Sequence, residues 1–231
     1  MRVLIFGATG MVGQGALREC LLDAGVESVV TIGRTATGQQ NAKLREIVHK
    51  DLWNYSAVEP QLAGFDACFF CLGVTSAGMN EADYTRLTHG IAAAAAETLA
   101  RLNPKMTFVF VSGVGADSTE TSRTMWARVK GKAENAVLHA GFRGAYVFRP
   151  AFIQPLHGIQ SRTKVYRVLY GIFRPLTPVL RALFPSYVLT TEEIGKAMLK
   201  VARVGAPKQV LEPRDIRALL NGESGGPTRD E

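Results

Sequence analysis

Three glycines near the N-terminus constrain the fold of this chain more than any other feature. The stretch FGATGMVGQG places Gly7, Gly10 and Gly13 directly after the apolar run of residues 3–6. In a strand–loop–helix turn, Gly7 would permit the tight bend, Gly10 would let the backbone approach a pyrophosphate, and Gly13 would let the helix pack close to the strand. This context favours a dinucleotide-binding loop at the N-terminus of a helix over a glycine-rich turn that binds nothing.

The first 150 residues alternate short apolar runs with longer helical stretches. Helices are expected over residues 10–24 and 81–102 and around Trp126 and Lys130. The expected strands cover residues 3–6, 28–32, 45–49, 67–71, 107–112 and 145–148. Strands this apolar, separated by helices, indicate a parallel sheet covered on both faces. We predict an α/β fold, a Rossmann-type doubly wound sheet in the order 3-2-1-4-5-6.

The expected organisation is a single domain with a short tail. Residues 1–150 form the nucleotide-binding core, and residues 151–220 form a small, mainly helical substrate-side region that completes the same domain. Residues 221–231 have the composition of a disordered tail.

Composition and cysteine usage point to an ordinary globular protein. Of 231 residues, 47% are apolar and 20% are charged. The N-terminus is no export signal, and no run approaches the roughly 20 apolar residues that span a bilayer. Cys68 and Cys71 form a CxxC inside an apolar run, which indicates buried thiols rather than a metal or redox site. We therefore expect a cytoplasmic protein with no bound metal.

The residues after the second expected strand predict which dinucleotide is bound. That strand ends in TIGRT, and no acidic residue lies between Glu27 and Glu46. An acid at this point accepts the ribose 2′-hydroxyl of NAD, whereas an arginine suits the 2′-phosphate of NADP. Arg34 therefore predicts NADP(H) over NAD(H), with a solvated loop arginine as the alternative.

Positive charge is concentrated in the segment between Glu134 and Glu192. This segment contains no acid and seven basic residues, namely Arg143, Arg149, Arg162, Lys164, Arg167, Arg174 and Arg181. The charge suits an anionic small-molecule substrate, contact of residues 156–187 with an anionic membrane surface, or a solvated helix face. No recognition motif supports a nucleic acid. The apolar side chains nearby could bury the interface of a homodimer as readily as a substrate.

Seven motifs within residues 1–205 together resemble one enzyme group. They are FGATGMVGQG, TIGRT, KDLWN, CLGVTSAG, VSGVGAD, WARVKGKAE and VFRPAFIQP. The sequence resembles the atypical short-chain dehydrogenase/reductases, particularly the HIV Tat-interacting protein 2 family and bacterial NAD-dependent epimerase/dehydratase-like proteins.

The resemblance implies a role in cofactor binding for each matching residue. Asp51 would accept the adenine amino group and Arg34 would hold the 2′-phosphate, while Lys130 would hold the nicotinamide ribose. The pyrophosphate loop would comprise Gly7, Thr9, Gly10, Met11, Val12 and Gly13. Leu52 would border the adenine, Leu72, Gly73 and Val74 would line the middle of the cofactor, and the backbone from Pro150 through Ile153 would meet the nicotinamide.

The resemblance also implies a catalytic site with one departure. Active members carry Y-x-x-x-K and a serine after the fifth strand, which here correspond to Lys130 and Ser112. The tyrosine position holds Trp126, whose indole N–H only donates a hydrogen bond and cannot serve as a general acid.

Three interpretations follow. The chain could be an oxidoreductase or epimerase/dehydratase-like enzyme that acts on a carbonyl or sugar-nucleotide-like substrate, with the proton coming from water, Ser112 or the C-terminal part. It could be a catalytically weak NADPH-sensing regulatory or scaffold protein. Alternatively, Trp126 is core packing and Lys130 an ordinary surface lysine.

Overall fold

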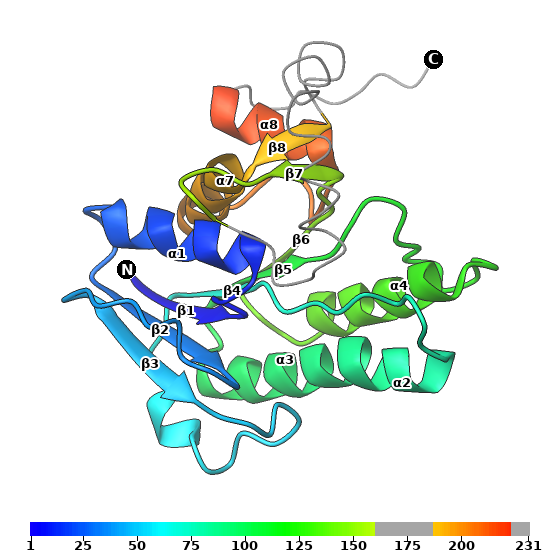
Figure 1. Ribbon diagram of the computed structural model, residues 1–231, viewed down its shortest axis with the longest axis horizontal. Coiled ribbons are helices and arrows are strands. Elements are labelled where there is room, and N and C mark those ends of the chain that lie inside the picture. The colour runs from blue at the N-terminus through cyan, green and yellow to red at the C-terminus, as the bar shows by residue number, and fades with distance from the viewer. Residues whose placement is uncertain (160–186, 223–231) are drawn as a thin grey trace.

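A seven-stranded parallel sheet forms the centre of the computed structural model, which describes residues 1–159 and 187–222 (Figure 1). Its strands are β1 (Arg2–Phe6), β2 (Ser28–Gly33), β3 (Leu44–Val48), β4 (Ala67–Phe70), β5 (Thr107–Val111), β6 (Gly144–Phe148) and β9 (Val210–Leu211). They are ordered β3-β2-β1-β4-β5-β6-β9. The predicted order 3-2-1-4-5-6 is confirmed, and β9 extends the sheet beyond β6.

The strands are apolar throughout because both faces of the sheet are covered. In β1, Leu4 and Phe6 pack into one hydrophobic core, whereas Val3 and Ile5 pack into the core on the opposite face. This alternation follows from the two-residue repeat of a strand. Because all strands are parallel, their carboxyl ends meet at one edge, where a doubly wound sheet binds its ligand.

Each face of the sheet has its own helices (Figure 1). The helices α1 (Met11–Leu22) and α7 (Thr191–Val204) cover one face, and α3 (Ile91–Leu102) and α4 (Met125–Leu138) cover the other. Gly15 on α1 allows a close approach to α7, because a Cβ there would lie 2.6 Å from the Thr191 carbonyl oxygen.

The helix predicted over residues 81–102 contains a π-helical segment. α2 (Glu81–Thr85) begins after Asn80, whose side chain accepts a hydrogen bond from the Asp83 amide, and the π-helix η2 (Arg86–Gly90) joins it to α3. A short 3₁₀ helix, η1 (Glu59–Gln61), precedes β4. The π-helix was not predicted, because hydrophobic periodicity does not distinguish one wider turn inside a helix.

The part of the chain after Pro150 adds strands as well as helices. β7 (Phe152–Gln154) pairs with β8 (Val188–Thr190) in a separate two-stranded sheet. α7 follows directly with a capping box in which Thr190 and Glu193 bond reciprocally, and α8 (Pro213–Asn221) follows β9. Figure 1 shows β7, β8 and α8 above α1.

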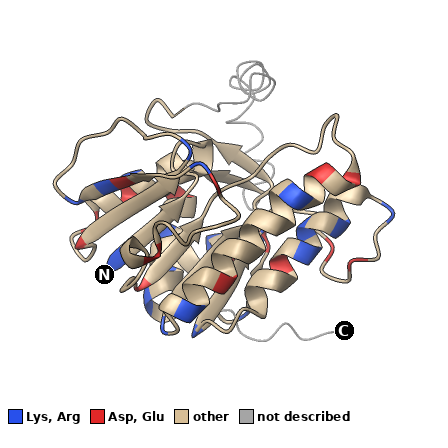
Figure 2. Cartoon of the chain, turned by 90° about the horizontal axis from the view of Figure 1, so that it is seen from below, with Lys and Arg blue, Asp and Glu red and all other residues tan. Residues whose placement is uncertain are grey.

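Two predictions fall on residues outside the described ranges. Most of the basic segment, including Arg162, Lys164, Arg167, Arg174 and Arg181, lies within residues 160–186, and so does most of the proposed membrane contact. The predicted tail falls mainly on residues 223–231. On the described surface, acidic and basic residues are interspersed along the helices (Figure 2). No helix among the described residues is long and apolar enough to cross a membrane.

Candidate functional site

The glycine loop has the geometry that its spacing predicts. Gly7 has a φ of +74°, and a Cβ there would lie 2.8 Å from the Cys71 carbonyl carbon. A Cβ on Gly13 would lie 2.1 Å from the Gly7 carbonyl oxygen. Gly7 therefore makes the bend after β1, and Gly13 lets α1 pack against that bend. No side chain larger than hydrogen fits at either position without moving backbone.

α1 begins at the glycine loop, where the first N–H groups of a helix have no intrahelical partner. Gly10 is the N-cap residue, in an extended conformation, and no described side chain caps the helix. Met11, Val12 and Gly13 form the first turn of α1. Its amides and the positive end of the helix dipole are suited to an anion such as a pyrophosphate.

A cleft opens beside the glycine loop at the carboxyl ends of β1, β2 and β3. It unites five residues that were predicted to bind the cofactor: Gly7, Thr9, Arg34, Leu52 and Leu72. Other residues also line it, namely Ala8, Thr31, Ile32, Gly33, Thr35, Ala36, Thr37, Glu46 and Ile47. Its combination of apolar walls, a glycine loop and one arginine suits the adenosine half of a dinucleotide.

One charged residue of this cleft, Glu46, was not predicted from the sequence. Its Oε2 accepts a hydrogen bond from the Thr37 amide at 2.6 Å and from the Thr31 hydroxyl at 3.3 Å. Arg34 is exposed directly after β2, and no described residue forms a hydrogen bond or ion pair with its guanidinium. Glu46 was missed because the acid was sought after β2, whereas it comes from β3, opposite Thr31 in the strand register.

The expected adenine residues lie in the loop after β3. Leu52 is buried, with 3% of its surface exposed, and lines the cleft. Asp51 is exposed, and its Oδ1 accepts a hydrogen bond from the Trp53 amide at 3.0 Å. Gly73 and Val74, expected along the middle of the cofactor, are exposed beyond β4. The role of the Asp51 carboxylate toward adenine stays a prediction.

The expected catalytic residues come from β5 and α4. Ser112 directly follows β5, and its Oγ is buried with no hydrogen-bond partner among the described residues. Buried hydroxyls are normally paired, so an unpaired one is consistent with a role for Ser112 toward a ligand, which stays a prediction. Burial lowers the pKa of Lys130 from its ordinary value of 10.5, and the charge of nearby Glu134 opposes that shift.

Trp126 is packed against the loop that joins β5 to α4. Gly115 in that loop has a φ of +86°, and a Cβ there would lie 3.1 Å from Cη2 of the indole. Trp126 thus supports a left-handed turn near Ser112. The predicted correspondence of Trp126 to a catalytic tyrosine stays a prediction.

A buried ionic cluster follows Lys130 along α4. Glu134 is fully buried and pairs with Arg149, which directly follows β6. Arg149 Nη2 also donates to the Ser118 hydroxyl at 2.7 Å, and Nη1 donates to Glu212 at 3.1 Å. The positive charge of Arg149, attributed above to the basic segment, is therefore neutralised inside the protein.

The segment expected at the nicotinamide end is anchored through its backbone. The Pro150 carbonyl accepts a hydrogen bond from the Val114 amide at 3.2 Å. Ile153 pairs with Leu189 between β7 and β8, and its side chain is buried in the core. The side chain of Ile153 is therefore not accessible to a ligand, and a contact of its backbone with the nicotinamide stays a prediction.

The thiols of Cys68 and Cys71 both have raised pKa values. Cys68 is buried in β4, and burial raises the pKa of its thiol well above the ordinary value. Burial also raises the pKa of Cys71 to about 12. Thiols that stay protonated are poor nucleophiles and poor metal ligands. No group of three or more potential metal-ligating side chains occurs within the described residues.

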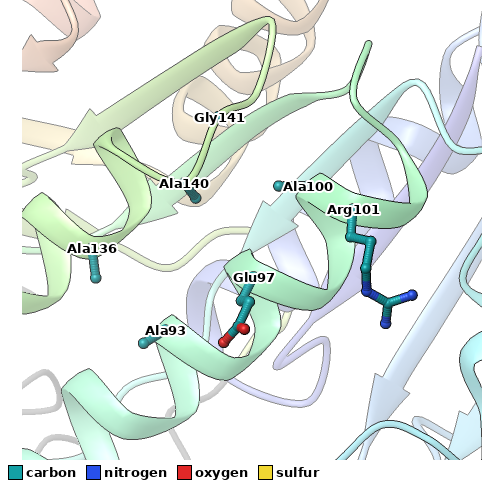
Figure 3. A pocket seen from close by; sticks show the side chains of 7 residues that line it. All are labelled: Ala93, Glu97, Ala100, Arg101, Ala136, Ala140 and Gly141. Atoms are coloured by element: carbon teal, nitrogen blue, oxygen red, sulfur yellow. The ribbon is translucent and has the colours of Figure 1, made fainter.

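A second concave surface lies between α3 and α4, away from the glycine loop (Figure 3). This groove, of about 480 Å³, is lined by Ala93, Glu97, Ala100, Arg101, Ala136, Ala140 and Gly141. Its walls are small side chains with one acidic and one basic residue. It has none of the cofactor-binding features of the cleft.

The sheet order, the glycine loop and the cleft together define a Rossmann-type α/β protein. The sequence profile of the NAD dependent epimerase/dehydratase family matches residues 3–132, which is more than half of the chain. The chain belongs to this family.

Three known proteins show how far the similarity extends. "Protein FMP52, mitochondrial" from Meyerozyma guilliermondii is 27% identical over 100% of this chain and 96% of its own length. The enzyme WbmF of Bordetella bronchiseptica, solved in complex with NAD⁺, has a TM-score of 0.66 at 13% identity, over 100% of this chain and 81% of its own. A short-chain dehydrogenase/reductase family oxidoreductase from Burkholderia thailandensis has a TM-score of 0.64 at 18% identity. The match covers 96% of this chain and 93% of the Burkholderia chain. The two solved structures support the fold alone.

The expected cytoplasmic location is wrong by this comparison. Curated relatives from several yeasts are named as mitochondrial proteins. The expectation rested on the lack of an export signal and of a membrane-spanning run, and neither property distinguishes the cytoplasm from other compartments.

Proposed function

We propose that the chain is an NADP(H)-binding oxidoreductase that acts on a carbonyl or sugar-nucleotide-like substrate. The observation that carries the proposal is the cleft in which an exposed Arg34 adjoins the glycine loop. A guanidinium suits a 2′-phosphate, because it presents several N–H donors to one anion. The family is NAD dependent, and the preference for NADP(H) is our inference from Arg34.

The residues of the site fit a dinucleotide. Gly7 and Gly13 leave room for backbone only, and the uncapped start of α1 offers amides to a pyrophosphate. Leu52 and Leu72 provide apolar walls of the cleft, which suit the faces of an adenine ring. A bound nicotinamide cofactor would supply the hydride, and the protein would supply position and electrostatics.

Two side chains support a catalytic role. Ser112 Oγ, buried without a described partner, can donate a hydrogen bond to a substrate carbonyl oxygen. The Lys130 ammonium can hold ribose hydroxyls, and its partial burial strengthens that interaction. Trp126 supplies no proton, so water or Ser112 would deliver it. We therefore expect slow turnover.

A second candidate function, NADPH sensing, is favoured by the packing of Trp126 on Gly115. In that role the cofactor would stabilise the loop from Gly113 to Thr124, and this surface would report occupancy to a partner. Hydride transfer would then be incidental.

The substitution Trp126→Tyr distinguishes the two functions. We would measure NADPH-dependent reduction of a panel of aldehydes, ketones and nucleotide-sugar ketones by the wild type, by Trp126→Tyr and by Trp126→Phe. A restored general acid is worth roughly 10²–10⁴-fold in rate. A gain of at least about tenfold in Trp126→Tyr alone supports the enzyme. No reduction by any variant, with NADPH binding intact, supports the sensor and contradicts the oxidoreductase.

A further inference from the structure

The cleft that contains Arg34 also contains an acid, and the two have opposite effects on a 2′-phosphate. Glu46 is half-buried on β3 and lines the same cleft as Arg34. A carboxylate at this point repels a phosphate and accepts hydrogen bonds from ribose hydroxyls. Its presence in a cleft suited to NADP(H) therefore needs a reason.

The hydrogen bonds of Glu46 provide that reason. Both described bonds reach Oε2, one from the Thr37 amide at 2.6 Å and one from the Thr31 hydroxyl at 3.3 Å. Thr31 belongs to β2, whereas Thr37 belongs to the loop that begins at Arg34. One carboxylate oxygen thus ties the arginine loop to the sheet, and no described residue bonds to Oε1.

We propose that Glu46 is a second determinant of cofactor choice, which holds the Arg34 loop in place while its charge limits the preference for NADP(H). This inference rests on the proposed function. Fixing the loop lowers the entropy cost of placing Arg34 at the phosphate. The negative charge works in the other direction, as a repulsive element against the 2′-phosphate.

The two effects can be separated by two substitutions. In Glu46→Gln, the amide oxygen still accepts from Thr37, so the anchor remains and only the charge is lost. In Glu46→Ala, both the anchor and the charge are lost. Glu27→Gln is the matched control, because Glu27 is exposed just before β2, at the opposite end of the sheet, and the change in net charge is the same.

Calorimetric titration measures the affinities of these variants for NADPH and NADH, and for adenosine 2′,5′-bisphosphate and 5′-AMP as probes of the adenosine end. We expect Glu46→Gln to bind NADPH and the bisphosphate about three- to tenfold more tightly, with NADH and 5′-AMP not tightened. The gain should shrink in high salt, and Glu27→Gln should not reproduce it. Glu46→Ala should bind NADPH more weakly than Glu46→Gln.

Three results overturn the inference. NADPH affinity that is unchanged in Glu46→Gln, while the wild type binds NADPH, shows that the charge is not sensed and leaves the proposed function standing. NADPH affinity that is equal in Glu46→Ala and Glu46→Gln removes the anchoring role. Wild-type protein that binds neither dinucleotide overturns the proposed function and this inference together.

Discussion

Arg149 and Glu134 form a two-contact ion pair inside the protein. Arg149 Nε lies 3.0 Å from Glu134 Oε1, and Nη2 lies 2.5 Å from Oε2. The pair joins α4, one turn after Lys130, to the end of β6, directly before Pro150. It therefore connects the helix that carries Lys130 with the segment proposed to meet the nicotinamide.

Breaking this pair from one side should destabilise the protein strongly. Arg149→Met leaves a fully buried carboxylate without its cation, which costs about 3–5 kcal/mol in the free energy of unfolding. The double variant Arg149→Met, Glu134→Gln should lose less free energy of unfolding than Arg149→Met alone, because it contains no buried carboxylate without a cation. Urea denaturation measures both, with the exposed Arg143→Met as the control. Equal losses in the single and double variants would contradict the assignment.

Gly131 on α4 should tolerate no side chain. A Cβ there would lie 1.6 Å from the Asp117 carbonyl oxygen, so Gly131→Ala must push the β5–α4 loop away from the helix. We expect a loss of at least about 1–3 kcal/mol in stability. Gly113→Ala, in the same loop, has no atom within 4 Å of its Cβ and serves as the control. Similar melting temperatures for the two variants would show that the loop is not packed this tightly.

Lys130 should make NADPH binding depend on pH in the alkaline range. Burial lowers the pKa of its ammonium from 10.5, so the positive charge is present below the lowered pKa and is lost as the pH rises through it. Affinity for NADPH should therefore begin to fall at a pH below 10.5. Lys130→Met should bind more weakly and lack this step, whereas Lys132→Met, at an exposed neighbour, should keep it. If the alkaline fall in NADPH affinity persists in Lys130→Met, another group is responsible for it.

Glu192 should stabilise the protein at neutral pH and not in strong acid. Hydrogen bonds from Lys196 and His157 lower the pKa of Glu192 from 4.5 to about 2. A carboxylate with a depressed pKa contributes stability above its unfolded value, and that stability is lost as the pH falls from about 4.5 to about 2. The site is partly solvated, so Glu192→Gln should cost less than about 1 kcal/mol at pH 7. The melting temperatures of the wild type and Glu192→Gln should approach each other as the pH falls from 7 to 3. A difference that stays constant over this range would contradict the lowered pKa of Glu192.

The order of the six predicted strands and the glycine loop could be predicted from the sequence because local patterns encode them. Apolar runs marked the strands, and the position of Gly7 and Gly13 after β1 predicted the bend and the close helix packing that the structure contains. Ser112 and Lys130 were placed through the resemblance to a known group.

Contacts between distant segments could not be predicted in this way. Glu46 reaches the cleft only through the register of β2 with β3, which no local pattern fixes. The partner of Arg149 is another example. An arginine in a basic stretch of sequence is expected at the protein surface, and only the fold shows that Arg149 pairs with the buried Glu134. The two-residue strand β9 is a third example, because its place beside β6 depends on the whole fold.

The central claim is the selective binding of NADP(H) through Arg34, and calorimetric titration of the wild type and Arg34→Ala with NADPH and NADH tests it most directly. The account predicts saturable binding that is at least about tenfold tighter for NADPH, because a guanidinium–phosphate contact is worth about 1.5–3 kcal/mol. In Arg34→Ala, this difference should disappear while NADH binding persists. Equal or tighter binding of NADH by the wild type, or a preference for NADPH that survives Arg34→Ala, would contradict it.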